Sequence, residues 1–129
     1  DDLKFLKNKC GSYLVGKCDK DMIKEVFKQA NKKKGFYYLL TLNTHYPYKP
    51  KKIDKNFLQK CEKQKIEKAV CLITQIYKEN LISIMSELKK TDKKIKVIIT
   101  GDHKPPFLKK EEQIYFPENK VINIEIEKK

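Results

Sequence analysis

The chain contains no arginine: all 30 of its lysine and arginine residues are lysines. Nucleic-acid-binding surfaces usually use arginine for bidentate contacts, and these lysines are spread along the whole chain rather than gathered in one stripe. The aromatic residues also fall in predicted buried runs instead of an exposed basic surface. The formal net charge of +13 therefore indicates a solvated coat of lysines with a weak general attraction to anions. We expect no nucleic-acid partner.

Long apolar runs are also missing. A membrane-spanning helix needs about 20 apolar residues, and the two longest uncharged runs, residues 35–48 and 69–77, are much shorter. The start of the chain has no basic segment followed by an apolar one, so we expect no signal peptide in it. With 129 residues, 40% of them hydrophobic, residues 1–129 are of single-domain size. We expect one soluble domain, whose membrane anchor, if it has one, lies outside this chain.

The four cysteines fall into two local pairs, Cys10 with Cys18 and Cys61 with Cys71. Neither pair has the Cys-x-x-Cys spacing of a zinc site or a redox motif. The pairs fit two disulfides and an oxidising compartment, although four cysteines allow other connectivities and reduced thiols remain an alternative. On one continuous helix Cys61 and Cys71 would be about 15 Å apart, so a bridge requires the helix to begin after Cys61.

The apolar pattern predicts an α/β fold. Between its elements, residues 50–60 are lysine-rich and are expected to be irregular. A strand, a long helix and a second strand form a βαβ unit, which makes the two strands parallel and the crossover right-handed. We therefore expect an open, mostly parallel sheet with flanking helices. The predicted elements are helices over residues 19–34 and 63–90, strands over 36–42, 95–100 and 121–126, and a short strand near 13–15.

The sequence VIITGDHKPPF, residues 97–107, contains the clearest candidate metal ligands. A β-branched apolar run stops at Gly101, Asp102 and His103 follow directly, and two prolines come after Lys104. Beyond Gly101 the chain is free to turn, so both side chains can face one site. A carboxylate beside an imidazole suits Zn²⁺ or Mn²⁺. The alternative is a polar turn that only ends a core strand.

A similar arrangement follows the first predicted strand. The sequence TLNTHYPY, residues 41–48, places His45 at the strand exit, next to a proline and aromatic residues. In parallel strands the carboxyl ends lie at one edge of the sheet, where ligands bind in open α/β folds. We therefore expect His45 to converge with Asp102 and His103 on one site.

These two motifs, FYYLLTLNTHYPY at residues 36–48 and VIITGDHKPPF at residues 97–107, resemble the C-terminal half of the sulfatase-like branch of the alkaline phosphatase superfamily. Within it the chain looks like the membrane-anchored phosphoglycerol and phosphoethanolamine transferases, including lipoteichoic acid synthase. Residues 16–22 and the spacing of Cys61 and Cys71 also resemble this group.

The resemblance implies a partial alkaline-phosphatase-like fold in an extracytoplasmic catalytic domain. Asp102 and His103 would bind a catalytic Zn²⁺ or Mn²⁺, and His45 would be a catalytic residue that contacts the phosphoryl group of the substrate. The donor would derive from a phospholipid and the acceptor would be an anionic component of the cell envelope.

The resemblance also implies that part of the site is missing. Family members carry a threonine or serine nucleophile and a further acidic ligand in an N-terminal half, upstream of everything matched here. Thr41, Thr44 and Thr100 lie near the predicted site, but none has the sequence context of that nucleophile. We therefore expect this C-terminal piece to be inactive alone, and motif context favours transfer over sulfatase-type hydrolysis. The alternative is a non-catalytic, lysine-rich module that binds anionic glycans or lipid headgroups.

Overall fold

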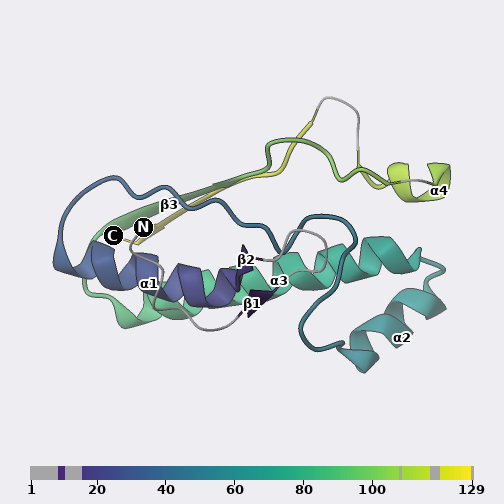
Figure 1. Cartoon of the computed structure of the whole chain (residues 1–129), viewed down its shortest axis with the longest axis horizontal. Coiled ribbons are helices and arrows are strands. Elements are labelled where there is room, and N and C mark those ends of the chain that lie inside the picture. Colours follow the sequence, from purple (N-terminus) through teal and green to yellow (C-terminus); the bar gives the residue numbers. More distant parts are fainter. Residues whose placement is uncertain (1–8, 11–15, 108, 117–119, 129) are drawn as a thin grey trace.

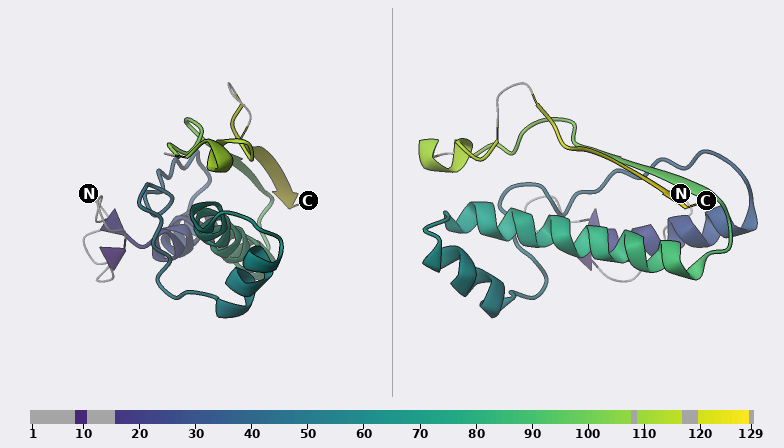
Figure 2. Two further views of the ribbon diagram at one scale, coloured as in Figure 1. Left: turned by 90° about the vertical axis from the view of Figure 1, so that its right-hand side faces the viewer. Right: turned by 180° about the vertical axis from the view of Figure 1, so that it is seen from behind.

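The structure, a computed structural model, describes the chain in four stretches: residues 9–10, 16–107, 109–116 and 120–128. The short strand predicted near residues 13–15 lies outside the described residues. A central pair of helices has two strands on one side and a shorter helix on the other (Figure 1, Figure 2). The helices are α1 (Asp19–Lys32), α2 (Lys55–Lys63), α3 (Lys68–Lys90) and α4 (Lys110–Gln113), and the strands are β1 (Lys9–Cys10), β2 (Gly16–Lys17), β3 (Ile95–Thr100) and β4 (Asn123–Lys128).

Helices α1 and α3 lie side by side and supply most of the core (Figure 1). Two aspartates in the first turn of α1 and a lysine in its last turn complement the helix dipole. The predicted apolar stripes face each other: Ile23 and Phe27 of α1 form one buried cluster with Ile84 and Leu88 of α3. The helix predicted from Asp19 is therefore confirmed, and it ends at Lys32.

The predicted helix over residues 63–90 is wrong at its beginning, because the chain turns between α2 and α3. Lys65 has a positive φ of 55°, and the amides of Lys65 and Ile66 donate to the carbonyls of Glu62 and Cys61, at 3.0 Å in both cases. This is a Schellman helix end, which usually has glycine at the left-handed position. A lysine there gives no such signal in the sequence. The turn also lets Cys61 and Cys71 lie on different helices, with Cα atoms 6.4 Å apart, so that they form a disulfide.

The expected open, mostly parallel sheet is not present in the described chain. The strand predicted over residues 95–100 is confirmed as β3, but its partner is the C-terminal strand β4, and the two are antiparallel with Ile95 opposite Lys128 and Thr100 opposite Asn123. Strands β1 and β2 form a second, very short antiparallel pair beside the disulfide between Cys10 and Cys18. The fold is therefore an arrangement of helices with two small antiparallel sheets.

The fold differs from the prediction because residues 36–42 form no strand. They run extended between α1 and α2, on the side of the helix pair that β3 also covers (Figure 1). Without a hydrogen-bonded partner strand they cannot be the first strand of a βαβ unit. β3 instead has one inward face, where Val97 and Ile99 pack on the helix pair, and one outward face, where Ile98 is 58% exposed.

Both pairs of cysteines predicted to be linked are disulfide-bonded. We expect replacement of Cys61 and Cys71 by serine to lower the free energy of unfolding by about 3 kcal/mol, because the bridge closes a loop of 10 residues. Urea unfolding of the variant and the native protein measures the difference. Thiol titration of the denatured, unreduced native protein is the control, and detection of reactive thiols there would contradict the pairing.

Candidate functional site

The two sequence motifs meet through their aromatic residues. Tyr48 ends the TLNTHYPY segment and Phe107 ends the GDHKPPF segment, and their ring centroids are 5.6 Å apart in an edge-to-face contact. Both rings are buried, 4% and 6% exposed, and they pack on Val70, Ile73 and Ile76 of α3. Segments almost sixty residues apart in the sequence therefore lie together on this helix.

Asp102 and His103 stand side by side at the end of β3. The amide of Gly101 donates to the carbonyl of Ile122, which continues the β3–β4 pairing for one further residue. Beyond this point Asp102 Oδ1 accepts a hydrogen bond from the amide of His103 at 3.0 Å, and it lies 3.7 Å from His103 Nε2. This separation is close to the distance of about 3.4 Å between two ligands of a tetrahedral Zn²⁺.

The hydrogen bonds of the two imidazoles fix which nitrogen of each ring faces outward. Nδ1 of His103 lies 2.7 Å from the carbonyl oxygen of Lys104, and Nδ1 of His45 lies 2.7 Å from that of Tyr46. A carbonyl oxygen only accepts, so Nδ1 is the donor in both rings and Nε2 is available to a ligand. Metal-binding histidines are commonly oriented in this way.

The structure does not gather the predicted site residues into one metal centre. Among the described residues, no three His, Cys, Asp or Glu side chains are close enough to hold a metal ion. Asp102 and His103 thus fit a metal as a pair, where catalytic zinc sites usually have three protein ligands. Both side chains are also open to solvent, at 80% and 61% exposure.

Two tyrosines lie in the region that joins the motifs. Burial raises the pKa of the Tyr77 hydroxyl, and the negative charge of Asp102 raises it further. Burial likewise raises the pKa of Tyr48, with smaller contributions from Tyr77, Glu112 and Tyr46. The Tyr48 hydroxyl is buried without a hydrogen-bond partner among the described residues. Asp102 thus lies close enough to Tyr77 to disfavour the ionised form of its hydroxyl.

Sequence reasoning missed the role of Asp19, which it identified only as the first residue of a predicted helix. Its carboxylate is 1% exposed; Oδ1 accepts from the amides of Leu42 at 3.2 Å and Asn43 at 3.4 Å, and Oδ2 accepts from Asn80 Nδ2 at 3.0 Å. The Asp19 amide donates back to Asn43 Oδ1 at 2.7 Å. This network fixes the residues that lead into the His45 turn, and its partners are too distant in the sequence to be recognised from it.

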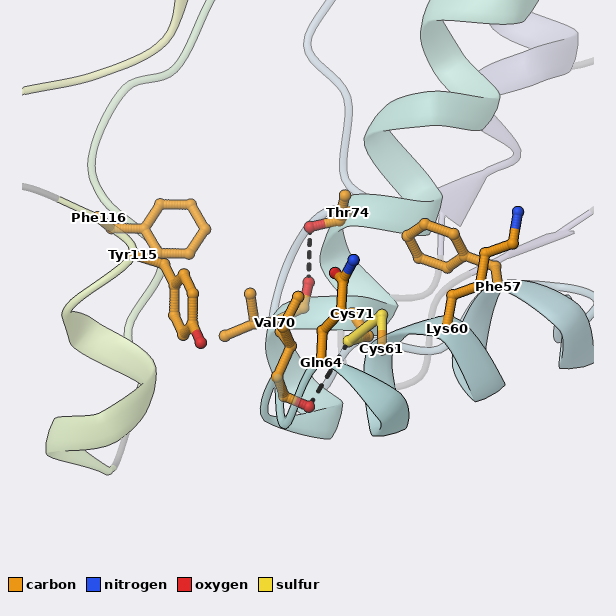
Figure 3. A pocket seen from close by; sticks show the side chains of 10 residues that line it. Phe57, Lys60, Cys61, Gln64, Val70, Cys71, Thr74, Tyr115 and Phe116 are labelled. Carbon is orange, nitrogen blue, oxygen red and sulfur yellow. Dashed lines mark hydrogen bonds between the residues drawn. A yellow bond between two sulfur atoms is a disulfide. The ribbon is translucent and has the colours of Figure 1, made fainter.

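A separate pocket of about 440 Å³ lies between α2, α3 and the residues after α4 (Figure 3). Its lining is mostly apolar and includes the disulfide between Cys61 and Cys71. Phe116 on its wall is 5.0 Å from Phe107, centroid to centroid, so the pocket adjoins the aromatic contact between the motifs. None of His45, Asp102 and His103 lines it; its lining residues are Phe57, Lys60, Cys61, Gln64, Ile66, Val70, Cys71, Thr74, Tyr115 and Phe116.

Comparison of the chain with protein-family models, curated proteins and solved structures gave no match. Its function is therefore inferred from its own residues and their geometry.

The buried Asp19 carboxylate predicts a pH-dependent stability. Burial is the main cause that raises its pKa above the ordinary value of 3.8, and the hydrogen bonds from Asn80, Leu42 and Asn43 oppose the shift. The folded protein then holds this proton more tightly than the unfolded chain does. Relative to Asp19→Asn, which cannot titrate, the native protein should gain stability as the pH falls through the folded pKa toward 3.8. Urea unfolding over a pH series measures this difference.

Asp19→Ala is the companion variant, because it removes the acceptor altogether. We expect its free energy of unfolding to fall by roughly 1–3 kcal/mol for each buried donor left without a partner. A native-minus-Asn difference that grows with rising pH, or an Ala variant as stable as the native protein, would contradict this account of the network.

Proposed function

We propose that the chain is the C-terminal part of an extracytoplasmic, metal-dependent phosphotransferase that moves phosphoethanolamine or phosphoglycerol from a phospholipid-derived donor to an anionic envelope acceptor. The observation that carries the proposal is the packing of the two motif segments on α3 through Tyr48 and Phe107. The two segments that carry the resemblance to a sulfatase-like active site thus pack on the same helix. Sulfatase-type hydrolysis is the related reaction that the same residues could serve.

Asp102 and His103 are the residues that would hold the divalent metal, Zn²⁺ or Mn²⁺. Their oxygen and nitrogen donors are adjacent, and the bond from His103 Nδ1 to the Lys104 carbonyl orients the ring with Nε2 outward. A bound metal supplies polarisation of a phosphoryl oxygen and lowers the pKa of a coordinated nucleophile. The local geometry of the pair fits this task.

His45 is the proposed contact to the phosphoryl group. Its Nδ1 is engaged by the Tyr46 carbonyl, so a protonated ring presents Nε2–H outward, where it can donate to a phosphoryl oxygen. The Asp19 network fixes Asn43, two positions before His45. The imidazole is therefore attached to a turn whose beginning is rigid.

The proposed catalytic site is incomplete in this chain. The nucleophile and a further acidic ligand would come from an N-terminal half of the domain, so the chain alone should bind metal weakly and transfer nothing. The two disulfides support an oxidising compartment outside the cytoplasm.

We expect calorimetric titration with Zn²⁺ to detect weak binding that depends on Asp102 and His103. Asp102→Ala and His103→Ala should each lower the affinity by at least about tenfold, since each removes one of two ligands. His45→Ala, which removes the other exposed imidazole, is the matched control and should leave the zinc affinity unchanged. Equal affinity in all four proteins would contradict the proposed ligand pair.

A lipid-based assay with a phosphatidylethanolamine donor tests for turnover. Transfer by the chain alone would contradict the proposal of an incomplete site.

The alternative, a lysine-rich module for anionic glycans or lipid headgroups, predicts binding to polyanions that weakens with salt and is unchanged by Asp102→Ala or a chelator.

A further inference from the structure

Residues 36–42 belong to no helix or strand, and none of the described strands pairs with them. Among the described residues, no backbone hydrogen bond joins residues 36–41 to another segment. Side-chain hydrogen bonds fix its ends: the Tyr37 hydroxyl donates to the carbonyl of Lys33 at 2.7 Å, and the amide of Leu42 donates to Asp19 Oδ1 at 3.2 Å. Its backbone polar groups therefore form an open edge.

The side chains of this segment alternate in the manner of a half-buried strand. Leu39 packs against the core cluster of α1 and α3, whereas Phe36, Tyr38 and Leu40 are 92%, 76% and 56% exposed. Single exposed apolar residues are common on protein surfaces. Three large ones at alternate positions beside an open backbone edge are typical of a binding surface.

We propose that residues 36–42 dock a β-strand of an acidic polypeptide, which adds its backbone to the open edge and covers Phe36, Tyr38 and Leu40. The mode is strand addition, in which main-chain hydrogen bonds give affinity and alternate side chains give specificity. The proposal rests on the proposed function in one respect, because it identifies this polypeptide as the upstream half of the same catalytic domain.

Charge selects this occupant over a second copy of the chain. Lys32, Lys33 and Lys34 are exposed immediately before the segment, so acidic residues at one end of the incoming strand would meet three positive charges. Two copies of this chain would instead bring together two surfaces from molecules of net charge +13.

Docking would also act on the candidate site. The open segment leads directly into Leu42 and Asn43, whose amides bind Asp19, and then into the His45 turn. A strand paired along residues 36–41 would fix the chain before this network. The docked polypeptide would thus order the turn that carries His45 while contributing the groups that the site lacks.

The test uses a fluorescent peptide of about eight residues, the usual length of a strand, in which valine and threonine alternate and glutamates stand at one end. We expect saturable binding to the native protein, and a triple variant Phe36→Thr, Tyr38→Thr, Leu40→Thr should bind at least about tenfold more weakly, since about 60 Å² of apolar surface accounts for tenfold. Threonine keeps the preference for extended backbone, so only the apolar surface is lost.

Two further variants test specificity. Ile82→Thr changes an isoleucine on α3 that is 57% exposed and should bind the peptide as the native protein does. Replacement of Lys32, Lys33 and Lys34 by glutamine should abolish the preference for the glutamate-ended peptide over one that ends in lysines. Circular dichroism checks that all variants are folded.

Three outcomes would overturn the proposal: failure of the native protein to bind the peptide, a dimer in sedimentation equilibrium that the triple variant abolishes, or binding to zwitterionic vesicles through the same three side chains. The second would identify another copy of the chain as the occupant, and the third a membrane surface. The triple variant should keep the zinc affinity of the native protein. Loss of the zinc site with retention of peptide binding would therefore contradict the proposed function alone.

Discussion

The buried carboxylate of Asp19 is the interaction on which the arrangement of the chain depends. Asp19 is the first residue of α1, and its carboxylate accepts hydrogen bonds from the backbone of residues 42 and 43 and from Asn80 in the middle of α3. A carboxylate with 1% exposure is costly unless it is fully hydrogen-bonded. The three segments are thus held in one relative position, because a shift of any one of them within the core would leave buried polar groups without partners.

Aromatic packing also holds the two motif segments together. Tyr46, Tyr48, Phe107 and Phe116 form a row in which neighbouring ring centroids are 5.0 to 5.6 Å apart. The row connects the turn after residue 43, the segment after β3 and the wall of the pocket lined by the disulfide. The candidate ligands Asp102 and His103 are exposed in the segment that leads to Phe107, so the packing places this segment without enclosing the site.

One part of the molecule buries its apolar side chains and pairs its strands, whereas another part leaves apolar side chains exposed and its backbone unpaired. The inward faces of β3, α1 and α3 form a continuous core, and the outward ion pair of Lys96 and Glu125, at 2.8 Å, suits a strand pair that faces water. Residues 36–42 instead expose large apolar side chains and an open backbone edge. The core is thus complete around the helix pair. The contrast supports the proposal that the surface at residues 36–42 is an interface.

The amino-acid sequence determined the local features: the helix from Asp19, the strand over Ile95–Thr100, the local disulfide pairs and the adjacency of Asp102 and His103, because each depends on neighbouring residues or a short period. Tertiary structure decided the rest. The apolar run at residues 36–42 fits a buried strand, but pairing requires a second strand at hydrogen-bonding distance, and β3 pairs with β4 instead. Lys65 ends a helix where glycine would have been the signal, and Asp19 acquires its role from Asn80, 61 positions away. Contacts of that kind depend on packing, which composition and spacing do not encode.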